Sequence, residues 1–233
     1  MATTRLDGRE SNQMRPPSME LRPLFRSDGS ARFSLGHSSA IAAVYGPREP
    51  KLRSREIFDR AAIEVIVRPR VGIPGPEEKK LEGHLMRQLE HVVMHSEYPR
   101  TQITIIVQLC SDGGSLGAVA SNAAFLALLD AGVALHSTVL SVAVGVRFGN
   151  TETPADALLL DPTEVEEREC DVVVALSVDC KKELLVSSLS TGSPLDAIAW
   201  AGCCEAGSKA CKVLEAFLRM SLEKRMGSFL TQA

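Results

Sequence analysis

Aromatic side chains are scarce in this sequence: Phe, Tyr and Trp together make up 4% of its 233 residues, with a single Trp. Proteins that hold single-stranded RNA by stacking its bases need several exposed aromatic rings. A stacking platform is therefore not expected. Histidine is also rare, with five residues, and no nucleophile-elbow motif is present, so a Ser-His-Asp or Cys-His enzyme has little support.

Long apolar runs are missing as well. No stretch reaches the roughly 18 consecutive apolar residues that a membrane-spanning helix requires. The first residues, which include Arg5 and Glu10, lack the apolar segment of a secretory signal. We therefore expect a protein of the cell interior with no membrane partner. Six Cys residues occur without a CxxC pair, which favours reduced core thiols over disulfides or a cysteine metal site.

An excess of positive charge is also lacking, because 26 Lys and Arg residues stand against 29 Asp and Glu, a net charge of −3. This excludes a chain coated in positive charge for nonspecific binding to nucleic acid. The charges are unevenly distributed: residues 1–100 carry 17 basic and 13 acidic residues, and residues 101–233 carry 9 and 16. The basic half can face a polyanion and the acidic half a cation, or both can simply solvate the surface.

The pattern along the chain predicts one domain of mixed secondary structure. Residues 1–18 are polar and aperiodic, so we predict a flexible tail or an arm that orders on a partner, followed by a single domain over residues 19–228. Thr163–Glu169 is expected to be irregular. Helices are predicted after Pro76, over 118–131 and over about 194–225, and strands within 27–47 and over 61–68, 102–109, 139–146, 157–160, 172–178 and 184–189.

The segment from Thr101 to Gly132 is predicted to form a strand, a glycine-rich turn and an apolar helix. The turn is Ser111-Asp112-Gly113-Gly114-Ser115. Backbone N–H groups are unpaired at the start of a helix, where the helix dipole is positive, so this turn is a candidate seat for an anion such as phosphate. A turn that only caps the helix explains the same residues, and both interpretations stay open.

Two groups of residues are candidates for acid–base or metal chemistry. An acidic cluster that includes Asp161, Glu164 and Asp171 leads into an apolar strand. Asp171 at the strand's start can serve as a general acid, or share a divalent cation with Glu164 or Asp161; a solvated acidic loop is the alternative. His91 and His95 lie four residues apart but lack the Glu of a zinc hydrolase, so we expect surface or capping roles.

Taken in order, several short motifs resemble the RNase PH family. The amino-terminal motifs are Arg22-Pro23, Ser27-Asp28-Gly29-Ser30-Ala31, Gly36 and Ala42-Ala43-Val44-Tyr45-Gly46-Pro47. The central motifs are Pro99-Arg100-Thr101, Asp112-Gly113-Gly114, Asn122-Ala123-Ala124, Ala127-Leu128 and Asp130-Ala131-Gly132-Val133. The third motif is Asp161 with Asp171-Val172-Val173-Val174-Ala175. Within the family, residues 27–30, 46–47 and 51–68 resemble ring subunits of the eukaryotic exosome.

The resemblance implies an α/β (α+β) fold of two βαβα halves, with mixed sheets packed against helices, and a ring of such subunits. It also implies a reaction in which inorganic phosphate, as co-substrate, attacks the last phosphodiester at the 3′ end of RNA and releases a nucleoside diphosphate. By position, Gly113, Gly114 and Ser115 match the family's phosphate-binding turn, and Asp171 matches its general acid.

Two arginines of the family's site are replaced. Leu116 stands at the arginine of the turn, and the arginine before the first helix falls near Pro74 or Gly75. Charge stabilisation would then rest on backbone N–H groups, Ser115 and nearby basic residues. Loss of one such donor costs on the order of 10²–10³ in rate, so we expect weak phosphorolysis. The predicted RNA-binding residues are Lys79, Lys80, Arg87 and Arg100.

Two other functions stay open at this point. The chain can be a catalytically inert, structural or RNA-binding ring subunit, or a hydrolytic nuclease that uses Mg²⁺ held by Glu164 and Asp171. The expected partners are RNA and other RNase PH-like exosome subunits, with a homodimer when the chain is isolated. The resemblance further implies location in the nucleus, the nucleolus and the cytoplasm.

Overall fold

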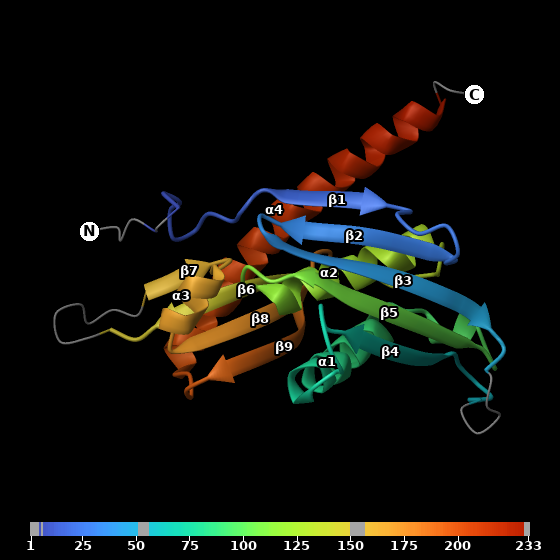
Figure 1. Cartoon of the computed structure of the whole chain (residues 1–233), viewed down its shortest axis with the longest axis horizontal. Coiled ribbons are helices and arrows are strands. Elements are labelled where there is room, and N and C mark those ends of the chain that lie inside the picture. Colours follow the sequence, from blue (N-terminus) through green and yellow to red (C-terminus); the bar gives the residue numbers. More distant parts are fainter. Residues whose placement is uncertain (1–4, 6, 51–55, 150–156, 231–233) are drawn as a thin grey trace.

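The computed structural model describes residue 5 and residues 7–50, 56–149 and 157–230. The first sheet has the strand order β1-β2-β3-β5-β4 (Figure 1). Its strands are β1 (Pro17–Leu21), β2 (Gly29–Leu35), β3 (Ser38–Arg48), β4 (Ala62–Arg68) and β5 (Gln102–Ser111). Neighbours are antiparallel except β4 and β5, which run parallel and are joined through helix α1 (Pro76–Val92). The apolar residues of β4 alternate with polar ones, which is why one face of this strand is buried.

The second sheet is wholly antiparallel, with the order β7-β6-β8-β9. Its strands are β6 (Val139–Arg147), β7 (Ala157–Leu160), β8 (Val172–Asp179) and β9 (Leu184–Gly192). Nearly every residue of β6 and β8 is buried, because other elements cover both faces of the central strands. Continuous Val-rich runs such as Val172–Val174 suit this environment.

Helix α2 (Leu116–Asp130) lies between the two sheets and packs against β2, β3 and β6. Residues 118–128 are buried without exception, so the helix is apolar on all sides. One polar residue inside it, Asn122, exchanges two hydrogen bonds of 2.8 Å with the backbone of Ser141 in β6. These bonds fix the position of α2 on the second sheet. Helix α1 covers β4 and β9, and helix α4 (Ala197–Leu230) covers β6 and β8.

The predicted α/β (α+β) class is confirmed, and the predicted strands occur within a few residues of their expected bounds. Thr163–Glu169 was expected to be irregular, and this is wrong: Glu164–Glu169 forms helix α3. Thr163 and Glu166 form a reciprocal capping box at its start. Helix α4 begins at Ala197 rather than 194, because the N–H of Ser193 still donates to the carbonyl of Asp171 beside β8.

The prediction of a flexible tail over residues 1–18 is wrong for the described part of that segment. Pro17 already opens β1, and residues 7–16, which we call the N-terminal strap, lie against the second half of the chain. Arg5 and Arg15 are each only 6% exposed. Ion pairs with distant carboxylates, rather than an apolar period, hold this segment, so its local sequence gives no sign of the order. Residues 1–4 and 6 lie outside the described residues.

Two expectations from composition can be compared with the structure. All six Cys residues carry free thiols, as predicted. In the described part of the chain, no helix combines the length and apolar character that crossing a bilayer requires. A short 3₁₀ turn at His95–Glu97 places the ring of His95 against the carbonyl of Glu90 on the preceding helix, which agrees with a capping role.

Candidate functional site

The glycine-rich turn connects β5 to α2, and its backbone N–H groups already have partners. The N–H of Gly113 donates to the hydroxyl of Ser38 (3.1 Å), and that of Gly114 to the carboxylate of Asp112 (3.1 Å). The N–H of Ser115 donates to Oε1 of Glu167 over 2.6 Å. The seat predicted for an anion at Ser115 thus holds an anion of the chain itself, the Glu167 carboxylate. Ser115 makes no side-chain cap hydrogen bond to the helix, and the sequence did not predict Glu167 at this position.

The turn and the segment around α3 are packed tightly together. The carbonyl of Gly113 accepts a hydrogen bond from the N–H of Glu164 (3.1 Å), and the Ser115 hydroxyl donates to the carbonyl of Pro162 (3.0 Å). Gly114 has φ +91°, and a Cβ there would lie 2.5 Å from that same carbonyl oxygen. Only glycine fits this position. The close contact between the backbone of the turn and the backbone at residues 162–164 therefore places the side chain of Glu167 next to Ser115.

The carboxyl of Glu167 has a pKa raised above its ordinary value. Burial is the main cause, because it disfavours the charged form, and the nearby Asp112 carboxylate adds repulsion. The hydrogen bond from Ser115 acts in the opposite direction. Glu167 is thus a half-buried carboxylate at a helix start, where the dipole favours negative charge.

Asp161, a predicted catalytic residue, is completely buried and bound to Arg15. Both of its carboxylate oxygens accept from the Arg15 guanidinium, at 2.6 and 2.8 Å, and one accepts from the Arg15 backbone N–H. Burial raises the pKa of Asp161, but the Arg15 contacts outweigh it and leave the pKa below the ordinary value. The same guanidinium donates to the carbonyls of Gly113 (2.7 Å) and Gly114 (3.1 Å). In this structure Asp161 therefore anchors the turn and has no contact with solvent, which argues against the predicted catalytic role.

A second buried ion pair lies beside the first. The Arg5 guanidinium donates to both oxygens of Glu166, at 2.6 and 2.7 Å, and to the backbone carbonyls of Leu160 and Asp161. The Arg5 contact lowers the pKa of Glu166 to about 2, against burial and with help from the hydrogen bonds of Thr163. The sequence predicted Glu166 and Glu167 only as members of the acidic cluster, without an individual role, and gave Arg5 and Arg15 no part in the site. The acidic cluster was a signal for the two glutamates, but nothing local marked the arginines.

Asp171, the predicted general acid, is exposed at the start of β8. Its Oδ2 accepts a hydrogen bond from the N–H of Phe148 (2.8 Å). Side chains alternate along a strand, so Asp171 shares a face of β8 with Ala175. A Cβ placed on Gly117, in the first turn of α2, would lie 3.8 Å from the Cβ of Ala175. The face of β8 that carries Asp171 therefore passes beneath the start of α2.

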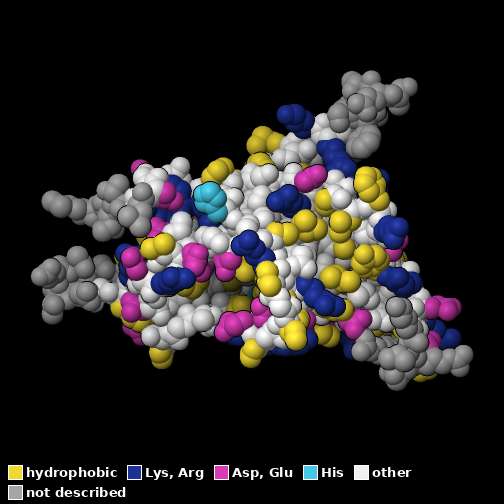
Figure 2. All heavy atoms as spheres, in the orientation of Figure 1, with side chains coloured by type: hydrophobic (Ala, Val, Ile, Leu, Met, Phe, Trp, Pro, Cys, Tyr) yellow, Lys and Arg dark blue, Asp and Glu magenta, His cyan; other side chains and the backbone are white. Residues whose placement is uncertain are grey.

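The predicted RNA-binding residues do not form one cluster. Lys79 pairs with Glu82 (2.7 Å). Lys80 donates to the hydroxyl of Thr191 (3.4 Å), which lies opposite Val173, two residues along β8 from Asp171. Of the four predicted RNA-binding residues, Lys80 is thus the one with a contact beside this strand end. On the face seen in Figure 2, Lys and Arg side chains are interspersed with Asp and Glu rather than gathered in one patch.

Arg87 and Arg100 lie apart from this strand end. Arg87 donates to the carbonyl of Gly83 on its own helix. Arg100 stacks on Phe58 with 5.2 Å to the ring centroid, just before β5 begins. The turn follows the other end of this 10-residue strand, which is roughly 30 Å long at about 3.3 Å per residue. Arg100 and the turn therefore belong to different parts of the surface.

Glu164 and Asp171, the candidates for magnesium, are not brought together by any shared contact. Glu164 is exposed on α3 and pairs with Arg168 (2.5 Å). Among the residues that the structure describes, no group of three or more His, Cys, Asp or Glu is arranged to hold a metal ion. Magnesium binding stays a prediction.

Comparison with known proteins shows the family to which the chain belongs. Residues 13–134 match the family model described as "3′ exoribonuclease family, domain 1", the RNase PH model. This match covers more than half of the 233 residues. The chain belongs to the RNase PH family of 3′ exoribonucleases.

Individual relatives and solved structures are similar to most of the chain. The chain is 36% identical over 169 residues to the exosome complex exonuclease RRP46 homolog of Oryza sativa, which covers 72% of this chain and 68% of the relative. It is 31% identical to the exosome complex component Rrp41 of Methanopyrus kandleri, over 96% of this chain and 93% of the relative. The crystal structure of rice Rrp46 superposes with a TM-score of 0.83 at 32% identity, over 94% of this chain and all of that one. An Archaeoglobus fulgidus exosome with RNA bound to the active site has the same fold (TM-score 0.77, 19% identity, 92% of each chain).

Proposed function

We propose that this chain is a ring subunit of an RNA exosome, that it takes part in 3′→5′ RNA processing and degradation, and that it removes terminal nucleotides weakly by phosphorolysis. Support for the first part comes from relatives named as exosome components that match 72% and 96% of the chain. Support for the proposed phosphorolysis comes from one observation: Asp171 presents an exposed carboxylate at the start of β8, on the strand face whose Ala175 lies under the first turn of α2, and Lys80 contacts the neighbouring strand β9.

The proposed reaction needs an acid and positive charge. An oxygen of inorganic phosphate attacks the terminal phosphorus of RNA, the bond from that phosphorus to O3′ of the preceding nucleotide breaks, and a nucleoside diphosphate leaves. Asp171 in its protonated form gives a proton to the departing O3′, so the shortened RNA ends in a hydroxyl. Lys80 and the positive end of α2 stabilise the charge of the transferred group.

Weak rather than efficient turnover is expected for two reasons. Leu116 provides no charge where the family has an arginine. The N–H of Ser115 is bonded to Glu167 and is unavailable to phosphate while that bond lasts. Each missing donor costs on the order of 10²–10³ in rate.

The test is product identity. The purified chain is incubated with single-stranded RNA labelled at its internal phosphates, with and without inorganic phosphate, and the released nucleotides are separated. We expect nucleoside diphosphates that depend on phosphate and disappear in Asp171→Asn. Glu20→Gln, an exposed carboxylate on β1, is the matched control and should retain activity. Equal activity in Asp171→Asn would exclude Asp171 as the acid.

A second candidate function is favoured by the Glu167 contact. If the Glu167 carboxylate holds the N–H of Ser115 permanently, the chain is a catalytically inert ring subunit that only binds RNA. The same assay then gives RNA binding without any product. Nucleoside monophosphates, formed without phosphate and suppressed by a chelator, would instead point to magnesium-dependent hydrolysis.

The partners and location form part of the proposal. RNA and other RNase PH-like exosome subunits are the expected partners, and the isolated chain is expected to form a homodimer. A mass measurement of the isolated chain tests the homodimer. Location in the nucleus, the nucleolus and the cytoplasm stays a prediction that imaging of a tagged chain can check.

A further inference from the structure

Helix α4 carries more apolar surface than the rest of the protein covers. Its buried face includes Cys203, Cys211, Leu214 and Leu218. Beside this face runs a second row with spacings of four, three, four and three residues, which we call the α4 stripe: Ala206, Ala210, Val213, Phe217 and Met220. Val213 and Met220 are 64% and 63% exposed. Ala210, in contrast, is buried and Phe217 packs partly against the core, so the uncovered part of this row is chiefly Val213 and Met220.

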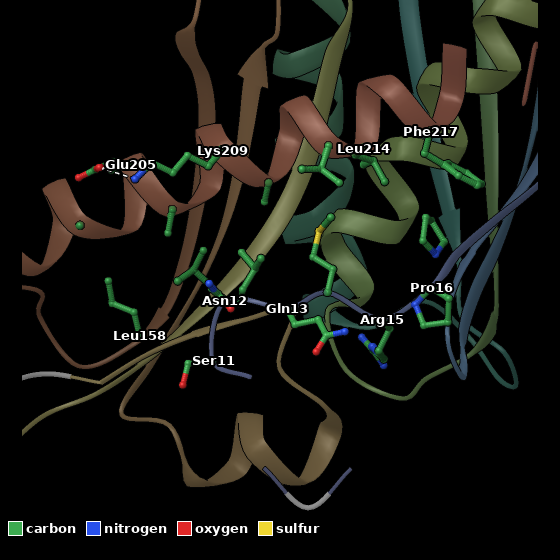
Figure 3. A pocket seen from close by; sticks show the side chains of 18 residues that line it. Ser11, Asn12, Gln13, Arg15, Pro16, Leu158, Glu205, Lys209, Leu214 and Phe217 are labelled. Carbon is green, nitrogen blue, oxygen red and sulfur yellow. Dashed lines mark hydrogen bonds and ion pairs between the residues drawn. The ribbon is translucent and has the colours of Figure 1, made fainter. Parts of the chain in front are cut away.

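The first part of the α4 stripe lines a groove (Figure 3). The N-terminal strap faces it with Met14 and Pro16, and Leu158 and Leu160 of β7 contribute further apolar surface. The groove encloses about 810 Å³, within the range of about 300–1,000 Å³ that is typical of binding sites. Its few charged groups include Glu205 and Lys209, which pair with each other (2.6 Å). An apolar groove of this size is the kind of surface that a partner covers.

The shape of this surface indicates a helical occupant. Spacings that alternate between three and four residues are those of a helix seam, in which side chains of one helix fit between those of another. The α4 stripe runs for about 21 Å at about 1.5 Å per residue. It continues beyond the groove to the exposed Met220, and the C-terminal part of α4 projects past the sheets (Figure 1). A compact small molecule would fill the groove and leave Met220 uncovered, whereas a helix along α4 covers both.

The charge of α4 indicates an acidic partner. Lys224 is exposed and occupies the next position of the stripe, four residues after Met220. The whole helix has five basic and three acidic residues. Glu205 and Glu215 pair with Lys209 and Arg219, and Lys212 pairs with Glu183 outside the helix. The exposed Lys224 is therefore the basic residue that an acidic partner would meet at the end of the stripe. A second copy of α4 would therefore bring a like charge to this surface, which disfavours self-pairing.

We propose that the α4 stripe and the adjoining groove bind an amphipathic helix of a partner protein, with apolar residues three and four positions apart and a carboxylate opposite Lys224. This mode of recognition places the apolar face of a helix into a hydrophobic groove. The proposed binding surface includes neither Asp171 nor Lys80, so the test of peptide binding is independent of the test of phosphorolysis.

The test starts from an unbiased probe. Helical peptides from a randomised displayed library are selected on the full chain, and the enriched sequences are synthesised and measured by fluorescence anisotropy. We expect the sequences to converge on aliphatic residues at the stated spacing, flanked by Asp and Glu.

Three substitutions and a matched control then locate the binding. Val213→Asp and Met220→Asp each place a charge inside the covered apolar contact, so affinity should fall at least about tenfold. Lys224→Glu should weaken binding of the acidic peptides in the same assay. Ile198→Asp is the control, because Ile198 is 84% exposed on the same helix but does not line the groove; its affinity should equal that of the unaltered chain.

Thermal unfolding of each variant checks that the fold persists. If Val213→Asp is destabilised, the affinity of Met220→Asp is the test of binding at the α4 stripe. The proposal is overturned if no peptide is enriched, if the enriched peptides lack the spacing or the acids, or if Met220→Asp and Ile198→Asp bind equally well. A dimer of the full chain that Met220→Asp separates would assign the surface to a second copy and would also overturn it.

Discussion

At the scale of single residues, Arg15 has the largest number of described partners around the turn. It binds both oxygens of the buried Asp161 and two carbonyls of the turn. Replacing it with Ala leaves the fully buried carboxylate with only the Arg9 guanidinium nearby, 3.5 Å away, and breaking a buried ion pair typically costs about 3–5 kcal/mol. We expect Arg15→Ala to lower the free energy of unfolding by that amount in urea denaturation.

Arg22→Ala is the matched control for this prediction. Arg22 also pairs with an aspartate, Asp130 (3.3 Å), but its side chain is 68% exposed. Exposed pairs contribute about 0–1 kcal/mol. If the two variants lost equal stability, burial of the Asp161 pair would have no energetic role.

The Arg5–Glu166 pair predicts a dependence of stability on pH. The pKa of Glu166 is about 2 in the folded chain, against an ordinary value of 4.5. A lowered carboxyl pKa stabilises the fold above the unfolded value, and this contribution is lost as pH falls from about 4.5 towards 2. Glu167, whose pKa is raised, acts in the opposite direction. We expect the Tm of the unaltered chain to fall more steeply over this window than that of Glu166→Gln; parallel Tm curves would contradict the assignment.

At the scale of elements, the contact between the β5–α2 turn and the start of α3 requires a glycine, without a side chain, at position 114. Gly114→Ala places a Cβ 2.5 Å from the carbonyl oxygen of Pro162 at φ +91°. Gly132→Ala has a comparable φ of +70° but nothing within 4 Å of the new Cβ. The backbone conformation alone costs about 1–2 kcal/mol. We expect both variants to lose that much in chemical denaturation and Gly114→Ala to lose clearly more; equal losses would show that the turn can move away from α3.

Elements with a clear period were predictable and those without one were not. The alternation in β4 and the helical spacing of Leu81, Leu85 and Leu89 in α1 come from burial of one face, which the sequence records directly. Helix α3 has six residues, too few to show a period, and is defined by its capping box. The strap is held by the ion pair between Arg15 and Asp161, which are 146 residues apart in the sequence, a relation that no local pattern contains.

The candidate site likewise contains some features that the sequence predicted and others that it did not. The turn was found because glycines and a following helix start are local features. Its occupant was not, because Glu167 reaches Ser115 only through the packing of Gly114 on the backbone of Pro162 and its neighbours. Asp171 was predicted from its position in a motif. The position of its strand, β8, under the start of α2 depends on the pairing of strands in the second sheet, which the sequence does not show.

At the scale of the whole molecule, the N-terminal strap connects the two halves of the chain. Removal of residues 1–16 would eliminate the arginine partners of both Asp161 and Glu166 and uncover one wall of the groove. We expect amide hydrogen exchange of residues 161–169 to accelerate in this truncated chain, while the centre of α2, buried by both sheets, exchanges as before. Unchanged exchange over residues 161–169 would mean that α3 is stable without the strap.

The same connection has a consequence for biosynthesis. Arg5 and its partner Glu166 are 161 positions apart, so at about 5–20 residues per second the ribosome needs roughly 8–30 s to supply the second after the first. During that interval Arg5 has been made and its carboxylate partner has not. The segment around Arg5 is therefore among the last of the described parts to reach its native position, and until then it is open to chaperones, proteases and any polyanion nearby.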